Sequence, residues 1–212
     1  MLRHLHVHQR CSPAYILENV LLLGDTRAHM RASAHEVRSW IGSAVLLDAA
    51  RVGSSAHRPR LWWTNQLPRE VLRRAYDSVH RDPGLLVDNI LDTGRYSQVV
   101  RVADRSPMAV MNRVGQPMMA LPTIVSFPSS HAYCDGGPGL VWDTHIRQLV
   151  EPRADERERA MGFATGVTAV PSISEASRRQ VLGQAMDLNC LTWIVSLGRA
   201  EQRWLRETSV VL

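Results

Sequence analysis

The sequence contains no lysine, so all 25 of its basic side chains are arginine, and the formal net charge is +5. Arginine binds phosphate oxygens through a planar fork of N–H donors that an ammonium group cannot match, so this composition favours contact with phosphate. GC-rich coding would also favour arginine over lysine, and many of the arginines are scattered along the chain. Both explanations remain open at the level of the sequence.

Cysteine and long apolar runs are also scarce. The three cysteines, Cys11, Cys134 and Cys190, are odd in number and far apart, which excludes a disulfide framework and a zinc-finger spacing. No apolar stretch approaches the roughly 18 residues of a membrane span, and residues 1–10 lack the apolar segment of a signal peptide. We therefore expect an intracellular protein, and the spacing of the three cysteines predicts no metal site.

Residues 1–65 have the order of predicted strands and helices that is typical of an α/β domain. The apolar run at residues 15–23 predicts a strand buried on both faces, as in parallel sheets. Residues 28–41 follow a helical pattern, and residues 44–49 and 60–64 predict two further strands. Strand, helix, strand, loop and strand in this order are typical of the α/β class.

The middle of the chain, residues 66–150, is less regular. Short helical segments are expected at residues 68–79 and 87–91, whereas residues 126–139 contain proline and glycine breakers and predict a loop. Residues 95–113 carry four arginines against a single acid. A region this irregular inside a compact chain is usually functional or disordered.

Regular structure is expected again in residues 151–212. Residues 153–161 predict a helix whose Glu and Arg side chains form a solvated face, held by pairs three and four residues apart. Ser174 is placed to cap a last helix, which would run toward Leu197 with a break at Gly183.

Glu18 closes the first strand and is the first candidate for chemistry. A carboxylate at the carboxyl end of a buried parallel strand points into the crevice where ligands bind in open α/β sheets. Such a group can hold a proton or share it with a ring nitrogen. Glu18 could equally be an acid that caps the following turn, a task for which Asn19 is as well suited.

Arg58 and Arg60 flank Pro59, which keeps the pair extended. Side chains two residues apart on an extended segment face the same way, so both guanidinium groups could meet one acceptor. They would then clamp an anion or a carbonyl oxygen. Without another indication of a site, two solvated arginines at a strand edge are the simpler interpretation.

A glycine interrupts the helical pattern in residues 182–186, Leu-Gly-Gln-Ala-Met. Gly183 could allow close helix packing, or it could belong to a loop whose backbone touches a cofactor.

Several blocks of residues stand in a fixed order along the chain. Residues 15–20 read Tyr-Ile-Leu-Glu-Asn-Val, and residues 55–65 read Ser-Ala-His-Arg-Pro-Arg-Leu-Trp-Trp-Thr-Asn. The other blocks are residues 91–96, 122–131, 156–163 and 178–186. Together they resemble the C-terminal half of a DNA cytosine-5 methyltransferase, most closely the de novo, vertebrate-type branch. The first block is similar to the sixth motif of that family, and the second to its eighth motif.

This resemblance implies an α/β fold: a partial Rossmann-like sheet of an S-adenosylmethionine-dependent methyltransferase with a small irregular target-recognition region. Glu18 would contact the N3 edge of a flipped cytosine, and Arg58 and Arg60 would hold the ring and its O2. The resemblance further implies cofactor and DNA contacts. These would be made by Gln184, Ala185 and Met186 with S-adenosylmethionine, and by Arg101, Arg105 and Arg113 with DNA.

The sequence departs from this family at the nucleophile. The family's cysteine lies in a Pro-Cys motif upstream of Glu-Asn-Val, after a glycine-rich cofactor turn, and neither feature is present here. Cys11 follows Arg10 and stands too near Glu18 to be that residue. Without the thiolate no covalent adduct with cytosine can form, so we expect an incomplete C-terminal part that is inactive alone.

The resemblance divides the chain into three functional segments. Residues 1–65 would hold late strands of the catalytic domain, residues 66–150 the target-recognition region, and residues 151–212 helices that return to the catalytic domain. The expected partners are DNA and either the missing N-terminal half or an active methyltransferase, in the nucleus if the source is eukaryotic. The alternative is a non-catalytic DNA-binding or regulatory methyltransferase-like subunit.

Overall fold

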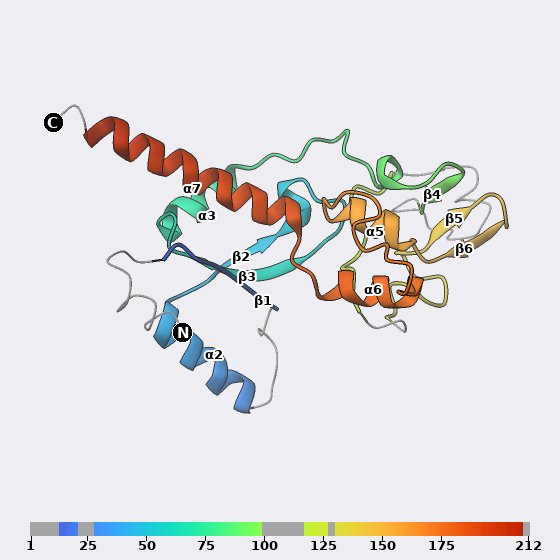
Figure 1. The fold of residues 1–212 in the computed structure, drawn as a ribbon, viewed down its shortest axis with the longest axis horizontal. Coiled ribbons are helices and arrows are strands. Elements are labelled where there is room, and N and C mark those ends of the chain that lie inside the picture. The colour runs from blue at the N-terminus through green and yellow to red at the C-terminus, as the bar shows by residue number, and fades with distance from the viewer. Residues whose placement is uncertain (1–12, 21–27, 99–116, 127–129, 210–212) are drawn as a thin grey trace. The chain divides into compact units, whose positions relative to one another are not determined.

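The structure, a computed structural model, describes residues 13–20, 28–98, 117–126 and 130–209 (Figure 1). The chain forms two compact units, each built from separate segments. The first unit comprises Met1–Leu47, Pro59–Val79 and Thr192–Leu212, and the second comprises Asp48–Arg58 and His80–Leu191. The division into three functional segments stays a prediction, because compactness does not test it.

A three-stranded sheet organises the first unit. Its strands are β1 (Ile16–Val20), β2 (Val45–Asp48) and β3 (Pro59–Thr64), in the order β1-β3-β2. The three strands predicted from apolar runs are thus confirmed, and they lie in one sheet. The order places β3 at the centre, where Trp62 and Trp63 are buried.

The predicted direction and burial of β1 are wrong. It pairs antiparallel with β3, with Glu18 opposite Trp62 and Val20 opposite Arg60. Its first residues are half-buried, and Val20 is 50% exposed. An apolar run alone does not distinguish a strand buried on both faces from an antiparallel strand whose far end reaches solvent.

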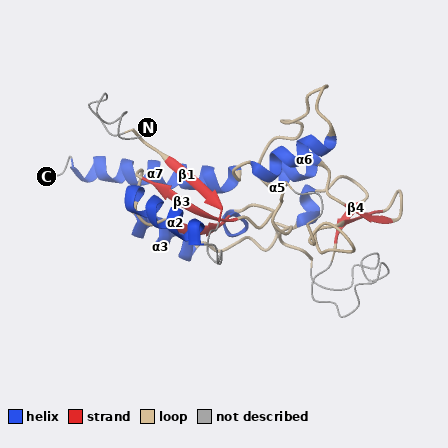
Figure 2. Ribbon diagram, turned by 90° about the horizontal axis from the view of Figure 1, so that it is seen from below, coloured by secondary structure: helices blue, strands red, loops and turns tan. Residues whose placement is uncertain are grey.

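Helices α2 (Ala28–Ile41) and α3 (Arg69–Ser78) complete the first unit together with most of α7 (Leu188–Ser209) (Figure 2). The helical predictions for residues 28–41 and 68–79 are both confirmed. Tyr76 of α3 meets Trp193 of α7 edge to face, with ring centroids 6.2 Å apart, which fixes the two helices against each other.

The second unit combines short elements. They are the 3-10 helices η1 (Ala49–Val52) and η2 (Val87–Ile90), the strands β4 (Arg95–Ser97), β5 (Val141–Asp143) and β6 (Gln148–Val150), and the helices α5 (Ala154–Ala160) and α6 (Glu175–Gln184). The strands form an antiparallel sheet in the order β4-β5-β6. Strands of three residues are too short to give a periodic signal, so the sequence does not predict this sheet.

A hydrophobic core joins these short elements. Val87, Leu121, Ile124, Met161 and Leu182 are almost fully buried in one cluster. They come from η2, the segment 117–126, the end of α5 and α6, so the core joins the irregular middle segment to α5 and α6.

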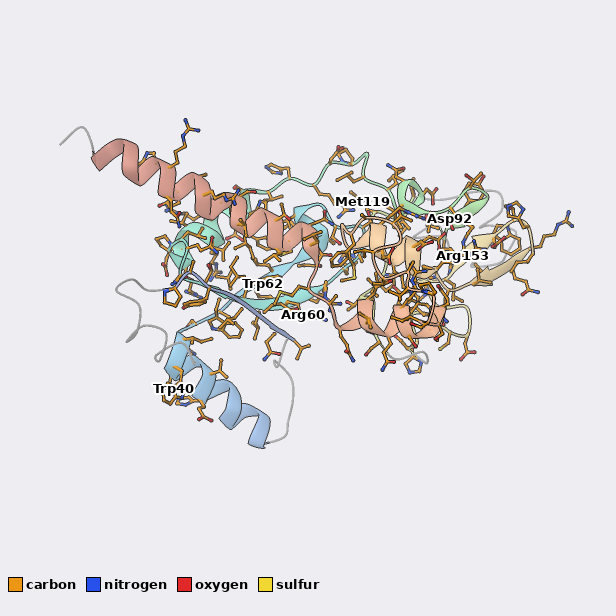
Figure 3. The ribbon with its side chains drawn as sticks, viewed as in Figure 1. Trp40, Arg60, Trp62, Asp92, Met119 and Arg153 are labelled. Carbon is orange, nitrogen blue, oxygen red and sulfur yellow. The ribbon has the colours of Figure 1, made fainter. Side chains whose placement is uncertain are left out.

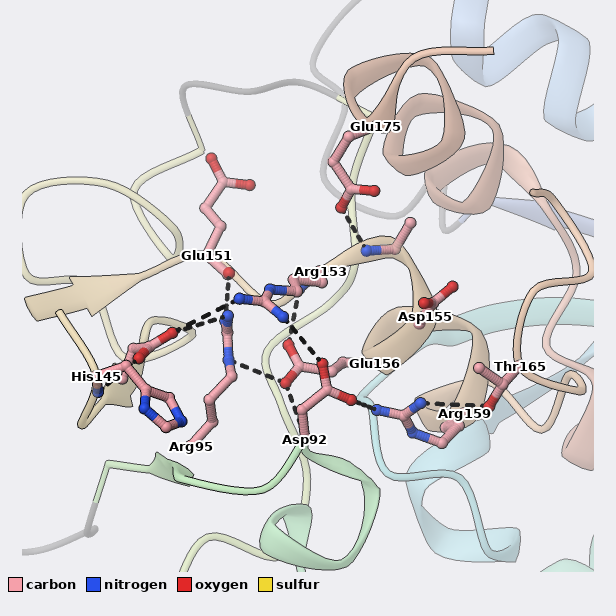
Figure 4. A network of polar contacts seen from close by, with 12 residues as sticks. Asp92, Arg95, His145, Glu151, Arg153, Asp155, Glu156, Arg159, Thr165 and Glu175 are labelled. Atoms are coloured by element: carbon pink, nitrogen blue, oxygen red, sulfur yellow. Dashed lines mark hydrogen bonds and ion pairs between the residues drawn. The ribbon is translucent and has the colours of Figure 1, made fainter. Parts of the chain in front are cut away.

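The charged face predicted for α5 is not solvated. Glu156, Arg157 and Glu158 are at most 2% exposed. The Glu156 carboxylate lies 3.0 Å from Nε of Arg95 in β4 and accepts the Asp92 N–H (Figure 4). The helix is charged because its acids and bases pair with other elements inside the unit, which a helical charge pattern cannot reveal.

The helix break expected at Gly183 is not there, and α6 ends one residue later. The Ser174 hydroxyl accepts from the Ser177 N–H, so the predicted cap is confirmed. Helix α6 continues through Gly183, and the chain leaves it only after Gln184. A Cβ at Gly183 would collide with the Ser126 backbone nitrogen, so the glycine permits close packing of the helix on this segment. Within the described residues, no helix is long and apolar enough to cross a membrane.

Candidate active site

Glu18 and Arg60 form a partly buried ion pair in the first unit. Arg60 and Trp62 are two residues apart on β3 (Figure 3). Trp62 is the partner of Glu18 in the antiparallel ladder, so period-two alternation brings the Arg60 and Glu18 side chains to one face of the sheet. Nε of Arg60 lies 2.9 Å from Oε1 of Glu18, and both side chains are 12% exposed. The strand pairing therefore brings together two of the residues singled out from the sequence.

The Glu18 carboxylate is incompletely satisfied. Among the described residues, Oε1 of Glu18 is buried and has no hydrogen-bond partner, and its contact with Nε of Arg60 at 2.9 Å is an ion pair. Arg60 instead donates from Nη1 to its neighbour, the Pro59 carbonyl oxygen. A buried carboxylate oxygen with an unused acceptor position is costly, and in a native protein it often marks a place where a ligand donates.

Arg58 has a different surrounding, in the second unit. Its Nη1 donates to the Ile124 carbonyl and its Nη2 to the Gly183 carbonyl, both at 3.1 Å. Its backbone N–H donates to the Asp48 carboxylate at 2.8 Å. The residue is 4% exposed, and its guanidinium links the backbone at Ile124 to the backbone at Gly183.

The prediction that Arg58 and Arg60 meet one acceptor is therefore wrong. Alternation along an extended segment fixes only the direction in which each side chain leaves the backbone. The two guanidinium groups then reach different partners: Arg60 the Glu18 carboxylate and Arg58 two carbonyl oxygens.

The block predicted to contact the cofactor lies at the C-terminal end of α6. Gln184 is the last residue of the helix, and the Ala185 N–H closes it by donating to the Val181 carbonyl. Met186 is 37% exposed. Arg58 binds the carbonyl of Gly183, so the structure brings Arg58 next to this block although 125 residues separate them.

Asp48 and His57 form a pair that no sequence pattern singles out. Nδ1 of His57 lies 2.8 Å from Oδ2 of Asp48. The hydrogen bond with Asp48 raises the pKa of His57 above its usual value. Asp48 therefore orders both the imidazole and the backbone that leads into Arg58.

Asp187, just before α7, is a second residue that the sequence-based prediction misses. Asp187 caps α7, because its Oδ1 accepts from the Cys190 N–H in the first turn of the helix. Its Oδ2 lies 2.7 Å from the Ser54 hydroxyl. Burial raises the pKa of Asp187 to about 6. An Asp that directly precedes an apolar helical pattern is the available signal for the cap, but nothing in the sequence indicates Ser54 as its partner.

The arginines predicted to contact DNA, Arg101, Arg105 and Arg113, lie outside the described residues. Within the described residues Cys134 and Cys190 form no disulfide, and Cys190 is buried. Cys11 lies outside the described residues.

Solved structures of methyltransferases share the fold. The chain aligns with the Dnmt2 methyltransferase of S. pombe with a TM-score of 0.58 and 15% identity, over 92% of this chain and 68% of that one. It aligns with the methyltransferase EhMeth of Entamoeba histolytica with a TM-score of 0.51 and 11% identity, over 90% of this chain and 63% of that one. No protein-family model matches the sequence, and no curated protein matches it significantly.

These alignments confirm the fold class predicted from the sequence. The chain is a mixed α/β protein with small antiparallel sheets, and it is structurally similar to methyltransferases. It spans about two thirds of the length of each of these two structures.

Proposed function

We propose that this chain carries the base-recognition part of a DNA cytosine-5 methyltransferase. The observation that supports this most directly is the Glu18–Arg60 ion pair, whose carboxylate keeps a buried oxygen without a hydrogen bond among the described residues. The proposed reaction transfers a methyl group to C5 of a cytosine that has left the duplex.

Glu18 would act on the N3 edge of the cytosine. In this proposal one oxygen of the Glu18 carboxyl group accepts from the exocyclic amine, and the other shares a proton with N3. A proton at N3 draws electron density from the ring and makes C6 a better target for a thiolate. Arg60 fixes the carboxylate and can turn a guanidinium N–H toward O2 of the base.

Arg58 would act through the backbone rather than on the base. Its two hydrogen bonds fix the Ile124 and Gly183 carbonyls, and so hold the end of α6 in place. Arg58 is therefore a positioning residue in this proposal, and Arg60 is the one that would contact the substrate.

S-adenosylmethionine is the proposed cofactor and would supply the methyl group. The end of α6 suits a contact at the edge of such a site, since Met186 is 37% exposed and the Gln184 side chain makes no hydrogen bond within the described residues. The cofactor would be held by the side-chain amide of Gln184, the backbone of Ala185 and the thioether of Met186.

The thiolate would come from a part of the enzyme other than this sequence. None of the three cysteines follows a proline, so none stands in a Pro-Cys motif. This favours, as a second candidate, a non-catalytic subunit that binds DNA and assists an active methyltransferase. On either proposal the chain alone transfers no methyl group from tritiated S-adenosylmethionine to DNA. Incorporation that survived Cys11→Ala would contradict both.

A binding measurement tests the proposed base recognition without requiring methyl transfer. We would titrate the chain with duplexes that carry one extrahelical cytosine or one extrahelical thymine. Thymine has a carbonyl where cytosine has an amine, so the Glu18 carboxylate should favour cytosine by about 10-fold, the value of one charged hydrogen bond. Glu18→Gln should abolish the preference, whereas Glu70→Gln, at an exposed side chain of α3, should retain it. Equal affinity of the unaltered chain for both duplexes would refute the proposal.

A further inference from the structure

A cavity of about 430 Å³ lies along α6 in the second unit. Its wall contains three charged side chains, Glu151, Arg157 and Arg179, and the amides of Gln180 and Gln184. The volume is within the range of sites that bind small molecules, roughly 300 to 1,000 Å³. We call this cavity the α6 pocket.

The charges in the α6 pocket do not balance. Nη2 of Arg157 lies 2.5 Å from Oε2 of Glu151, and Nη1 of Arg179 lies 2.8 Å from the same oxygen. One carboxylate thus serves two guanidinium groups, which leaves the three side chains with a net charge of +1. A partly enclosed excess of positive charge favours an anionic ligand.

Arg157 binds other groups of the protein and is not available to a ligand. Its Nε donates to the Pro152 carbonyl at 3.0 Å, and its guanidinium lies 4.9 Å from the centre of the Tyr133 ring. It is 2% exposed, so its part is to hold Glu151 in place.

Arg179 is the donor that remains. Its side chain is 29% exposed, and within the described residues its buried Nε has no hydrogen-bond partner. The side chains of Gln180 and Gln184 likewise make no hydrogen bond within the described part of the chain. The pocket therefore offers one guanidinium that is 29% exposed, beside two amides that can donate or accept.

We propose that the α6 pocket binds the phosphate group of a nucleotide, with Arg179 as its main contact. A guanidinium fork matches phosphate oxygens, and the cavity has room for more than a bare phosphate. The two amides would then meet polar groups of the sugar or base. The phosphate could belong to a free nucleotide or to a DNA strand. The proposal does not depend on Glu18, Arg58 or Arg60, and it shares only Gln184 with the contact proposed for S-adenosylmethionine.

The test is a titration of the full chain with two probes at low salt. The probes are thymidine monophosphate, whose base Glu18 should not favour, and a short DNA duplex. Arg179→Gln removes the guanidinium and should weaken binding by about 10- to 100-fold, as expected when a charge-assisted hydrogen bond is removed. Arg73→Gln, in an exposed pair of the first unit, removes the same charge and should have little effect. Gln180→Glu adds a negative charge to the pocket wall and should also weaken binding, which keeps the test valid if Arg179→Gln unfolds the protein.

The two probes separate the sources of the phosphate. Loss of mononucleotide binding in both pocket variants identifies a free nucleotide. A loss confined to the duplex, with a salt slope reduced by the value of about one phosphate, identifies a DNA phosphate. The proposal is overturned if neither probe is sensitive to both variants. Because Glu18→Gln should leave mononucleotide binding unchanged, failure here is distinct from failure of the proposed function.

Discussion

The guanidinium of Arg58 donates to the carbonyl oxygen of Gly183 at 3.1 Å and thereby joins two blocks that stand 125 residues apart. The second terminal nitrogen of Arg58 binds the Ile124 carbonyl in the same way. One arginine side chain thus fixes the end of α6 against the segment that packs beneath Gly183.

Arg58→Ala should destabilise the protein by about 3 kcal/mol, because two buried carbonyl groups lose their donor and a cavity is left. Arg58→Lys should restore little of this, because one ammonium cannot reproduce the fork. Urea unfolding measures both values. Arg199→Ala, at an exposed position of α7, is the control and should change stability by less than about 0.5 kcal/mol. A loss of that small size for Arg58→Ala would show that its hydrogen bonds do not hold the fold together.

Asp187 should make stability depend on pH. Burial raises the pKa of Asp187 to about 6, above its value of 3.8 in an unfolded chain. The folded state therefore holds the proton more tightly, and the stabilisation is complete below about pH 4 and lost as pH rises through 6. The shift corresponds to roughly 3 kcal/mol.

The comparison that isolates this effect is unfolding of the unaltered chain and of Asp187→Asn at several values between about pH 4 and pH 7.5. Asparagine retains the helix cap and can donate to Ser54, but it does not titrate. The unaltered chain should lose stability relative to the variant as pH rises. If the difference in unfolding free energy between the two proteins is constant over this range, Asp187 is not the group whose protonation changes on unfolding.

The sequence predicts the local elements well and their pairings poorly. The helix at 28–41 and the strands around residues 16–20, 45–48 and 59–64 follow from periodicity within each segment. The antiparallel direction of β1 depends on which strand it meets, and no short-range pattern contains that information.

The same reason explains which site residues the sequence can indicate. Glu18 and Arg60 both stand out in the sequence, but their ion pair depends on the register of β1 and β3. Charged residues of α5 look solvated because their partners, such as Arg95, lie about 60 residues away. The role of Arg58 depends on carbonyl groups, which every residue has and no sequence pattern marks.

Glu156→Gln should cost about 3 kcal/mol, because the buried Arg95 guanidinium loses the nearer of its two carboxylate partners and keeps only Asp143. The exposed pair Arg73–Asp77 on α3 provides the matched comparison, and Asp77→Asn should change stability by less than about 1 kcal/mol. Chemical unfolding of the two variants gives the contrast. Equal, small losses would mean that the buried pair contributes no more than a surface pair.

The arginine-rich segment should govern the salt dependence of DNA binding. If Arg101, Arg105 and Arg113 touch phosphates, their joint replacement by alanine should reduce the slope of log affinity against log salt by about 0.9 for each phosphate that is no longer bound. Fluorescence anisotropy with a labelled duplex between about 50 and 200 mM salt is sufficient. An unchanged slope in the triple variant would place the DNA contacts on other residues.

The most direct test of the central claim is the NMR signal of cytosine N3 in a duplex that carries one ¹⁵N-labelled extrahelical cytosine. If Glu18 shares a proton with N3, addition of the chain should shift this resonance, and addition of Glu18→Gln should not. Glu70→Gln should behave like the unaltered chain. A resonance that is unmoved by the unaltered chain, or that moves equally with Glu18→Gln, would contradict the assignment of the Glu18–Arg60 pair to base recognition.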